Sequence, residues 1–316
     1  MSVSIVPPGR LVYGMQLQVQ SKSKTFAEDW ERGAGREELE AITRKADETG
    51  FFYVGVCDHI AVPRPIDEHM RTTWYDTVAT LGWIAALTRN VRLLSHIYVV
   101  GYRHPLATAK AFMTLDELSG GRAILGVGAG HLEAEFALLD ADFRGRGRRT
   151  DDAIDVIRAA LTDEYPNVET PSWKVHGAGL APRPRQAQVP IWIGGSSRAA
   201  LRRAAERGDG WVPQGTPRHE MPESISYLLE HRKATLGDEP IDIGVITEVL
   251  YVGKPAWDVG DRTSAGSPDH LAERLNEFAD MGVSHLQIRF RNRSLAELLD
   301  QMDAFGAEVA PLLRGR

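Results

Sequence analysis

Three glycines alternate with other residues in the stretch ILGVGAGH at residues 124–131. Glycines at the end of a strand can let the backbone approach a phosphate or a flat cofactor. The dinucleotide-binding fold spaces them as G-x-G-x-x-G and places an acidic residue about 20 residues further on. Here Gly130 comes one residue early, and His131 stands where the third glycine should be. The spacing disfavours a dinucleotide fold and leaves the role of the glycines open.

Asp58 and His59 directly follow the apolar run FFYVGVC, which ends in Cys57, the one cysteine of the chain. An imidazole can hydrogen-bond a carbonyl group or exchange a proton near neutral pH. Because His59 follows a strand, we predict a functional role for it, although most histidines have structural ones. A single cysteine cannot form an intramolecular disulfide, so we interpret Cys57 as a buried, inert thiol of a cytoplasmic protein.

The segment IWIGGSS at residues 191–197 has the pattern of a strand followed by a tight turn, and the helical segment RAALRRAAERG comes next. Backbone N–H groups at a helix start, helped by the helix dipole, form a site for anions. An ordinary turn with a serine cap is the alternative. The residues of the turn leave both interpretations open.

Short apolar runs alternate with longer amphipathic segments along almost the whole chain, which is typical of a parallel barrel. Eight such repeats over somewhat more than about 250 residues predict an α/β fold, a TIM (β/α)8 barrel with insertions, as a single domain over residues 1–316. The insertions are residues 18–36, 164–189 and 253–266. Residues before Leu11 are expected to be a loose lead-in. The predicted strands are residues 11–17, 52–57, 91–100, 123–128, 190–194, 210–213, 242–252 and 284–290.

Composition excludes several classes of partner. The formal net charge of −6 and a pI near 6.0 argue against a nucleic-acid-binding surface. No apolar run approaches the ~20 residues that span a bilayer, and the first ten residues lack the pattern of a secretory signal. We therefore expect no nucleic-acid partner and no membrane association.

Two kinds of barrel chemistry are disfavoured by the residues at the predicted strand ends. A metal-dependent hydrolase would need clustered histidines or carboxylates there, and the first strand, YGMQLQVQ, supplies none, so no metal site is predicted. A Schiff-base enzyme would need a lysine in the mouth of the barrel, and only Lys254 comes near a predicted strand end.

Four segments, residues 38–63, 89–130, 146–161 and 189–213, resemble the bacterial luciferase-like family. The motifs RHP, LDELSGGR and GVGAG occur in order in the second segment, and the similarity extends from about residue 13 to 313. The family consists of barrels that bind flavin mononucleotide (FMN) or the deazaflavin coenzyme F420. The resemblance therefore implies that the glycines of GVGAG end the fourth strand and let the backbone lie close to a bulky cofactor.

The resemblance also implies the site residues. His59 is the expected catalytic residue, and Asp58 and His59 line the flavin or deazaflavin ring. A cis peptide bond is expected between His96 and Ile97. Gly194 and Gly195 are expected to hold the cofactor phosphate through backbone N–H groups. The other cofactor-binding positions are His96, Ile97, Tyr98 and Val99 after the third strand, Gly128, Ala129, Gly130 and His131 after the fourth, and Ser196 and Ser197 in the phosphate-binding turn.

Two positions depart from the sugar-phosphate dehydrogenase branch of this family. That branch has a glutamate directly after the last glycine of GVGAG, where this chain has His131. It also has a tryptophan a few residues after the strand-two histidine, where this chain has Pro63. Activity on glucose phosphate is therefore not expected.

The choice of cofactor rests on the same resemblance. The segments around IWIGGSS and GYRHPLATAKAFMTLDELSGGR resemble deazaflavin-dependent oxidoreductases, and Arg146, Arg148 and Arg149 are suited to attract an anionic polyglutamate tail. We predict hydride transfer between F420 and a small organic substrate, by a homodimer. The alternatives are an FMN-dependent monooxygenase using reduced flavin and oxygen, or a non-catalytic flavin-binding relative.

Overall fold

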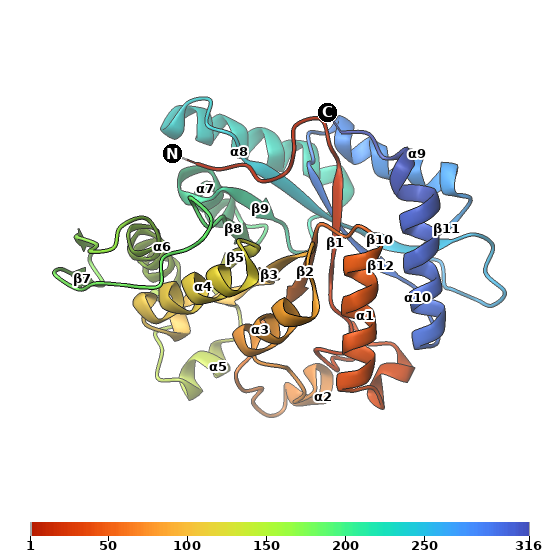
Figure 1. Ribbon diagram of the computed structural model, residues 1–316, viewed down its shortest axis with the longest axis horizontal. Coiled ribbons are helices and arrows are strands. Elements are labelled where there is room, and N and C mark those ends of the chain that lie inside the picture. The colour runs from red at the N-terminus through yellow and green to blue at the C-terminus, as the bar shows by residue number, and fades with distance from the viewer. Residues whose placement is uncertain (1, 316) are drawn as a thin grey trace.

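Parallel strands joined by helices form a closed barrel in this computed structural model, which describes residues 2–315 (Figure 1). Within those residues, eight strands pair in the order β1-β2-β3-β5-β8-β9-β10-β12, and β12 pairs with β1 to close the ring. All of these pairings are parallel. The predicted TIM barrel is confirmed. The strands are β1 (Val12–Gln16), β2 (Tyr53–Val56), β3 (Arg92–Ser95), β5 (Ala123–Gly128), β8 (Ile191–Gly194), β9 (Gly210–Val212), β10 (Asp242–Val252) and β12 (His285–Phe290).

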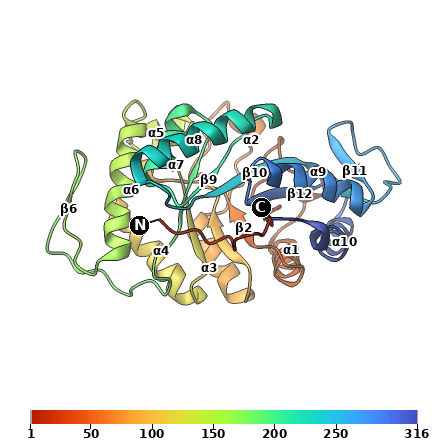
Figure 2. The same cartoon turned by 90° about the horizontal axis from the view of Figure 1, so that it is seen from above.

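Helices surround the ring (Figure 2). Ser267 accepts a hydrogen bond from His270 N at the start of α9, and Gly282 follows its end with a φ of +97°. No helix within residues 2–315 is long and apolar enough to cross a lipid bilayer. The helices are α1 (Arg36–Glu48), α2 (Asp67–Met70), α3 (Thr77–Leu87), α4 (Pro105–Ser119), α5 (Glu133–Leu138), α6 (Arg146–Thr162), α7 (Arg198–Arg207), α8 (Met221–Leu236), α9 (Pro268–Asp280) and α10 (Leu295–Ala304), with short 3-10 or π turns at Asp29–Arg32, Val100–Tyr102, Arg218–Glu220, Phe305–Val309 and Ala310–Leu312.

Apolar side chains fill two regions. The inside of the barrel holds a small cluster, and a much larger cluster lies between the strands and the surrounding helices. Alternate residues of each strand face one region or the other, because side chains on a strand point to opposite faces in turn. The inner cluster consists of Tyr53, Leu94, Ile124, Trp192 and Val212.

The three predicted insertions form different structures. Residues 18–36 contain the turn Asp29–Arg32, and residues 253–266 contain β11 (Thr263–Gly266), which pairs in parallel with the second half of β10. Residues 164–189 contain the antiparallel pair β6 (Val168–Glu169) and β7 (Lys174–Val175), which projects from the side of the barrel (Figures 1 and 2).

The third predicted strand, residues 91–100, is interrupted. β3 ends at Ser95, and the chain resumes as β4 (Tyr98–Val99), which pairs with the end of β5. Between them lies the expected cis peptide bond, His96–Ile97. This interruption places residues of the segment at the mouth of the barrel.

The N-terminal segment is not the loose lead-in expected from the sequence. Val3 N donates to Asp209 Oδ1 at 3.1 Å. Ser4 Oγ and Ile5 N donate to the Asp242 carboxylate at 2.6 and 3.0 Å. Both aspartates are buried where β9 and β10 begin, so they need donors there. The segment supplies those donors and crosses the N-terminal end of the barrel.

Candidate active site

A cavity of about 670 Å³ lies at the C-terminal ends of the barrel strands. This is the end at which TIM-barrel enzymes carry their active sites. Residues from the loops after β1, β2, β5, β8 and β9 also reach it. The predicted site residues that line the cavity are Asp58, His59, His96, Ile97, Val99, Gly128, Ala129, Gly130, His131, Gly194, Gly195 and Ser197.

Two predicted positions do not line the cavity. The Tyr98 ring packs against Phe112 in α4, with a centroid separation of 5.5 Å, and lies under the Arg103 guanidinium. His96 and Ile97 both face the cavity, so the alternation of side chains breaks there and Tyr98 points away. Ser196 Oγ donates to Gln214 O and accepts from Gln214 N, each at 2.9 Å. Ser196 therefore anchors the turn after β8 to the loop after β9.

His96 and Ile97 contribute an uncharged surface to the cavity. His96 is buried, and burial lowers the pKa of its imidazole to about 4, so the ring is neutral at physiological pH. Within residues 2–315 neither ring nitrogen of His96 has a hydrogen-bond partner. Both nitrogens are also shielded from solvent, so His96 contributes to the cavity as a neutral wall and not through its ring nitrogens.

The glycines at the strand ends make room for a side chain rather than for a cofactor alone. A Cβ on Gly128 or Gly194 would collide with Ile97. Gly130 has a φ of +77°, and a Cβ there would collide with Phe136 and Val99. The resemblance implied that the glycines of GVGAG let the backbone lie close to a cofactor. In the structure these glycines also make room for side chains of the protein itself.

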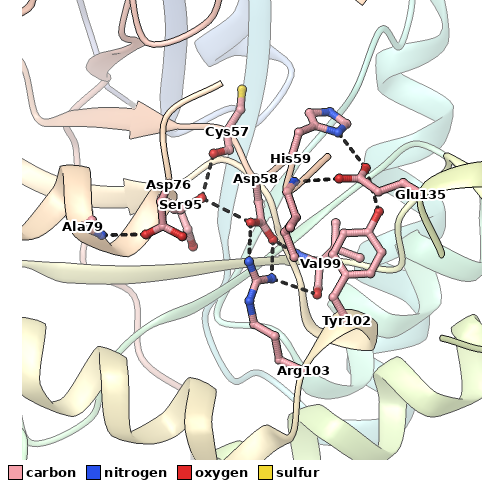
Figure 3. Close-up of polar contacts among 12 residues, drawn as sticks. Cys57, Asp58, His59, Asp76, Ala79, Ser95, Val99, Tyr102, Arg103 and Glu135 are labelled. Carbon is pink, nitrogen blue, oxygen red and sulfur yellow. Dashed lines mark hydrogen bonds and ion pairs between the residues drawn. The ribbon is translucent and has the colours of Figure 1, made fainter. Parts of the chain in front are cut away.

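His59 lies at the wall of the cavity, and its ring points towards Glu135 (Figure 3). Its Nδ1 atom lies 2.9 Å from Oε2 of Glu135, which is fully buried on α5. The Trp74 ring packs edge-on against the imidazole with a centroid separation of 4.4 Å, and the His131 ring lies at 6.0 Å. The sequence-predicted catalytic residue therefore has a fixed ring with a carboxylate partner.

Asp58 is committed to an ion pair (Figure 3). Both of its oxygens accept from the guanidinium of Arg103 at 2.7 Å, and Oδ2 also accepts from Val99 N at 2.8 Å. Arg103 lies just before α4, so this pair ties the end of β2 to the strand segment and helix that follow β3. Asp58 adjoins the cavity mainly as a structural anchor.

The side of the cavity formed by the turn after β8 and by residues of α6 and α7 suits an anion. Gly195 N donates to Val212 O at 3.1 Å, so this N–H is engaged with the neighbouring strand in the structure. Within residues 2–315 the N–H groups of Ser196 and Ser197 find no acceptor, and α7 begins directly after them. Arg146 and Arg203 also line this side. Arg203 is paired with Asp151, whereas Arg146 donates to the carbonyls of Gly130 and Phe143.

The part of the cavity formed by the loop after β1 and the segment after β2 is mainly apolar. Phe26 comes from the loop after β1, and Met70 and Trp74 come from the segment after β2. Trp74 packs against His59, although it lies 15 residues further along the chain.

Cys57 lies nearer the cavity than its interpretation as a core thiol implied. It is half-buried and lines the cavity, yet burial raises the pKa of its thiol to about 12. A thiol with that pKa is protonated at neutral pH and is a poor nucleophile. The expectation of an inert thiol therefore agrees with its surroundings.

Sequence reasoning missed several residues of the site. Glu135, Tyr102 and Arg103 act through other side chains. Arg103 begins the RHP motif but was given no role in the site, and Arg203 lies inside an ordinary amphipathic helix. Arg146 was predicted to attract the polyglutamate tail of the cofactor. In the structure Arg146 lines the cavity, whereas Arg148 is exposed. Arg149 stacks on Trp173.

Residues 15–257 match the family model of the luciferase-like monooxygenases. The chain belongs to this family. It is therefore an enzyme of the luciferase-like family and an oxidoreductase. The match covers most of the barrel and includes every residue that lines the cavity.

Similar proteins include both deazaflavin-dependent enzymes and monooxygenases. An F420-dependent glucose-6-phosphate dehydrogenase of Beutenbergia cavernae is 26% identical over 88% of this luciferase-like chain and 94% of its own. A monooxygenase from Streptomyces bottropensis has the same fold, with a TM-score of 0.79 at 21% identity over 95% of this chain and 99% of its own. A coenzyme F420-dependent tetrahydromethanopterin reductase from Methanopyrus kandleri has a TM-score of 0.74 at 19% identity, covering 96% and 99%.

Proposed function

We propose that this luciferase-like enzyme transfers hydride between the deazaflavin coenzyme F420 and a small organic substrate. The observation that carries the proposal is one cavity with an anion-binding side, an uncharged surface at His96 and Ile97, and His59 fixed in the wall. When bound, F420 supplies a ring carbon that gives or accepts the hydride. His59 would bind the reacting heteroatom of the substrate and exchange a proton with it.

The residues present fit such a cofactor. The free N–H groups of Ser196 and Ser197 and the positive end of α7 are suited to its phosphate, and Arg146 adds a cation without a carboxylate partner within residues 2–315. The neutral His96 ring and Ile97 form an uncharged wall against which a flat ring could pack. Phe26, Met70 and Trp74 leave an apolar space for the substrate.

F420 is favoured over FMN by the relatives that match most of the chain. The glucose-6-phosphate dehydrogenases named as F420-dependent cover 85% and 88% of it, whereas a curated monooxygenase relative covers 48%. Titration of the purified protein with each cofactor tests the choice. We expect tight binding of F420 and oxidation of its reduced form by organic acceptors without oxygen. Preference for FMN with oxygen-dependent hydroxylation would instead establish a monooxygenase, and binding without turnover on any acceptor would indicate a storage protein.

The role of His59 is tested by the variant His59→Gln. Loss of general acid–base help is expected to lower kcat by about 100- to 10,000-fold. Cofactor affinity is measured separately, because His59 is itself expected to line the cofactor ring. His219→Gln is the matched control, since His219 is exposed on the outside of the barrel. Turnover of His59→Gln within a few-fold of wild type would show that His59 is not catalytic.

We also propose that the enzyme is a cytoplasmic homodimer, as the family resemblance implies. Sedimentation equilibrium at several protein concentrations tests the oligomeric state, and a mass of one chain throughout would contradict it. Fractionation of the source cells tests the location.

A further inference from the structure

Glu135 receives four hydrogen bonds although it is fully buried. Its two oxygens have separate partners (Figure 3). Oε1 accepts from the backbone N–H groups of Ile60 and Ala61 at 2.6 and 3.1 Å. Oε2 lies 2.9 Å from His59 Nδ1 and 3.0 Å from the Tyr102 hydroxyl. One oxygen therefore holds the backbone after β2, and the other holds the imidazole ring.

The carboxylate of Glu135 is ionised at neutral pH. Burial raises the pKa of Glu135, but the hydrogen bonds from His59, Ala61 and Ile60 outweigh burial, so the pKa lies below its ordinary value. An ionised carboxylate has no proton and can only accept hydrogen bonds. The Tyr102 hydroxyl must therefore donate to it, and His59 Nδ1 must carry a proton whether the ring is neutral or cationic.

We propose that Glu135 is a positioning residue that keeps the proton on His59 Nδ1 and leaves Nε2 as the ring nitrogen that exchanges protons in the cavity. This inference rests on the proposed function of His59. Trp74 packs against the ring and limits its rotation. The titratable groups that face His59 are Glu135, His131 and, through Glu135, Tyr102, while the neighbouring Asp58 is paired with Arg103.

The arrangement has a defined chemical consequence. When a substrate double bond between carbon and a heteroatom takes up a hydride at carbon, the heteroatom gains a negative charge and needs a proton. Nε2–H of a cationic His59 can give that proton and leave a neutral ring, still protonated on Nδ1. In the reverse direction Nε2 accepts the proton from the substrate. A neutral ring with its proton on Nε2 could not act as that base.

Nitrogen-15 NMR of the cofactor-free protein, with labelled histidines, tests this directly. In the wild type the neutral His59 ring is expected to show protonated Nδ1 and unprotonated Nε2. In Glu135→Gln the amide oxygen must still face the N–H groups of Ile60 and Ala61, so the amide NH2 faces Nδ1 and donates to it. The proton should then move to Nε2. Tyr102→Phe is the matched control, because it removes a donor to the same oxygen and should leave the proton on Nδ1.

Turnover measurements separate this inference from the proposed function. Glu135→Gln is expected to lower kcat by about 100-fold or more, within the range for acid–base catalysis, with cofactor affinity unchanged. The double variant Glu135→Gln with His59→Gln should have a kcat only slightly below that of Glu135→Gln alone. A wild-type ring protonated on Nε2 would overturn the inference, and this measurement needs no variant to fold. A proton shift in Glu135→Gln with normal turnover would leave the positioning intact and overturn the proposed role of His59.

Discussion

Ile97 and Gly194 are packed so tightly that a Cβ on the glycine would lie 2.6 Å from Ile97 Cγ1. The same side chain faces Gly128, where a Cβ would lie 2.8 Å from Cγ2, and Gly126, where it would lie 3.2 Å from Cδ1. Two neighbouring strands, β5 and β8, therefore omit side chains where Ile97 enters the barrel. The glycines shape the cavity by receiving Ile97.

Gly194→Ala is expected to destabilise the protein, because overpacking a buried site costs about 1–3 kcal/mol. Ile97→Ala alone should also destabilise it, by leaving a void. In the double variant the new methyl group occupies space vacated by Ile97. The double variant should therefore lose less stability than the sum of the losses in the two single variants. Urea denaturation of the four proteins measures this coupling. Strict additivity would contradict the packing relationship.

Arg146→Met is expected to weaken cofactor binding about 10- to 100-fold, because a charge-assisted hydrogen bond contributes about 1.5–3 kcal/mol. Methionine retains the apolar stem that packs on Phe143. Arg144→Met makes the same change of net charge at an exposed position outside the cavity, and its affinity should stay within about two-fold. Isothermal titration calorimetry compares them. Equal losses in both variants would indicate general electrostatic attraction instead of a contact at Arg146.

Arg103→Met is expected to destabilise the protein by about 3–5 kcal/mol, because it leaves the buried Asp58 carboxylate without its cation. Asp58→Asn combined with Arg103→Met removes both charges and should recover part of that loss. Chemical denaturation at neutral pH gives the free energies of unfolding. If Arg103→Met costs less than about 1 kcal/mol, the pair is not the anchor that its geometry indicates.

Stability should fall as the pH falls from about 6.5 towards 4, in part because of His96 and His285. Burial lowers the pKa of His96 to about 4 and that of His285 to about 3. Both values lie below the ~6.5 of an unfolded chain, so the unfolded state takes up protons first. The stabilising contribution is fully present above pH ~6.5 and is lost as the pH falls towards the folded-state values.

His285→Gln isolates one of these two histidines. Removing this histidine removes up to one proton from the difference in proton uptake between the unfolded and folded states. The slope of the unfolding free energy against pH should therefore decrease by up to about 1.4 kcal/mol per pH unit. The variant will also lose the stacking of His285 on Trp192, but that loss does not depend on pH. Urea unfolding at pH 7.5, 6 and 5 measures the slope, with the exposed His219→Gln as control. An unchanged slope in His285→Gln would contradict the assignment.

Periodicity in the sequence was sufficient to predict the barrel, because each buried strand and amphipathic helix follows a local pattern that neighbouring residues determine. The end of the third strand could not be predicted in the same way. Counting alternate residues places Tyr98 in the cavity with His96, but Ile97 takes that position because the strand is interrupted after Ser95.

The residues around His59 show a different limit. Glu135 meets His59 from a helix 76 residues later, and Trp74 meets it from the loop after β2. No spacing rule links such partners, since the closed barrel alone brings them together. The turn after β8 lines the cavity, but Gly195 N in that turn bonds the neighbouring strand, a long-range contact that no local pattern in the sequence indicates.

The bonds between the N-terminal segment and Asp242 join residues 236 to 238 positions apart. A ribosome must therefore complete about three-quarters of the chain before Ser4, Ile5 and Val6 can find their acceptor. During that time the first strands have no partner on one edge, because β12 lies later still. Final docking of the N-terminus is therefore a late event of biosynthesis.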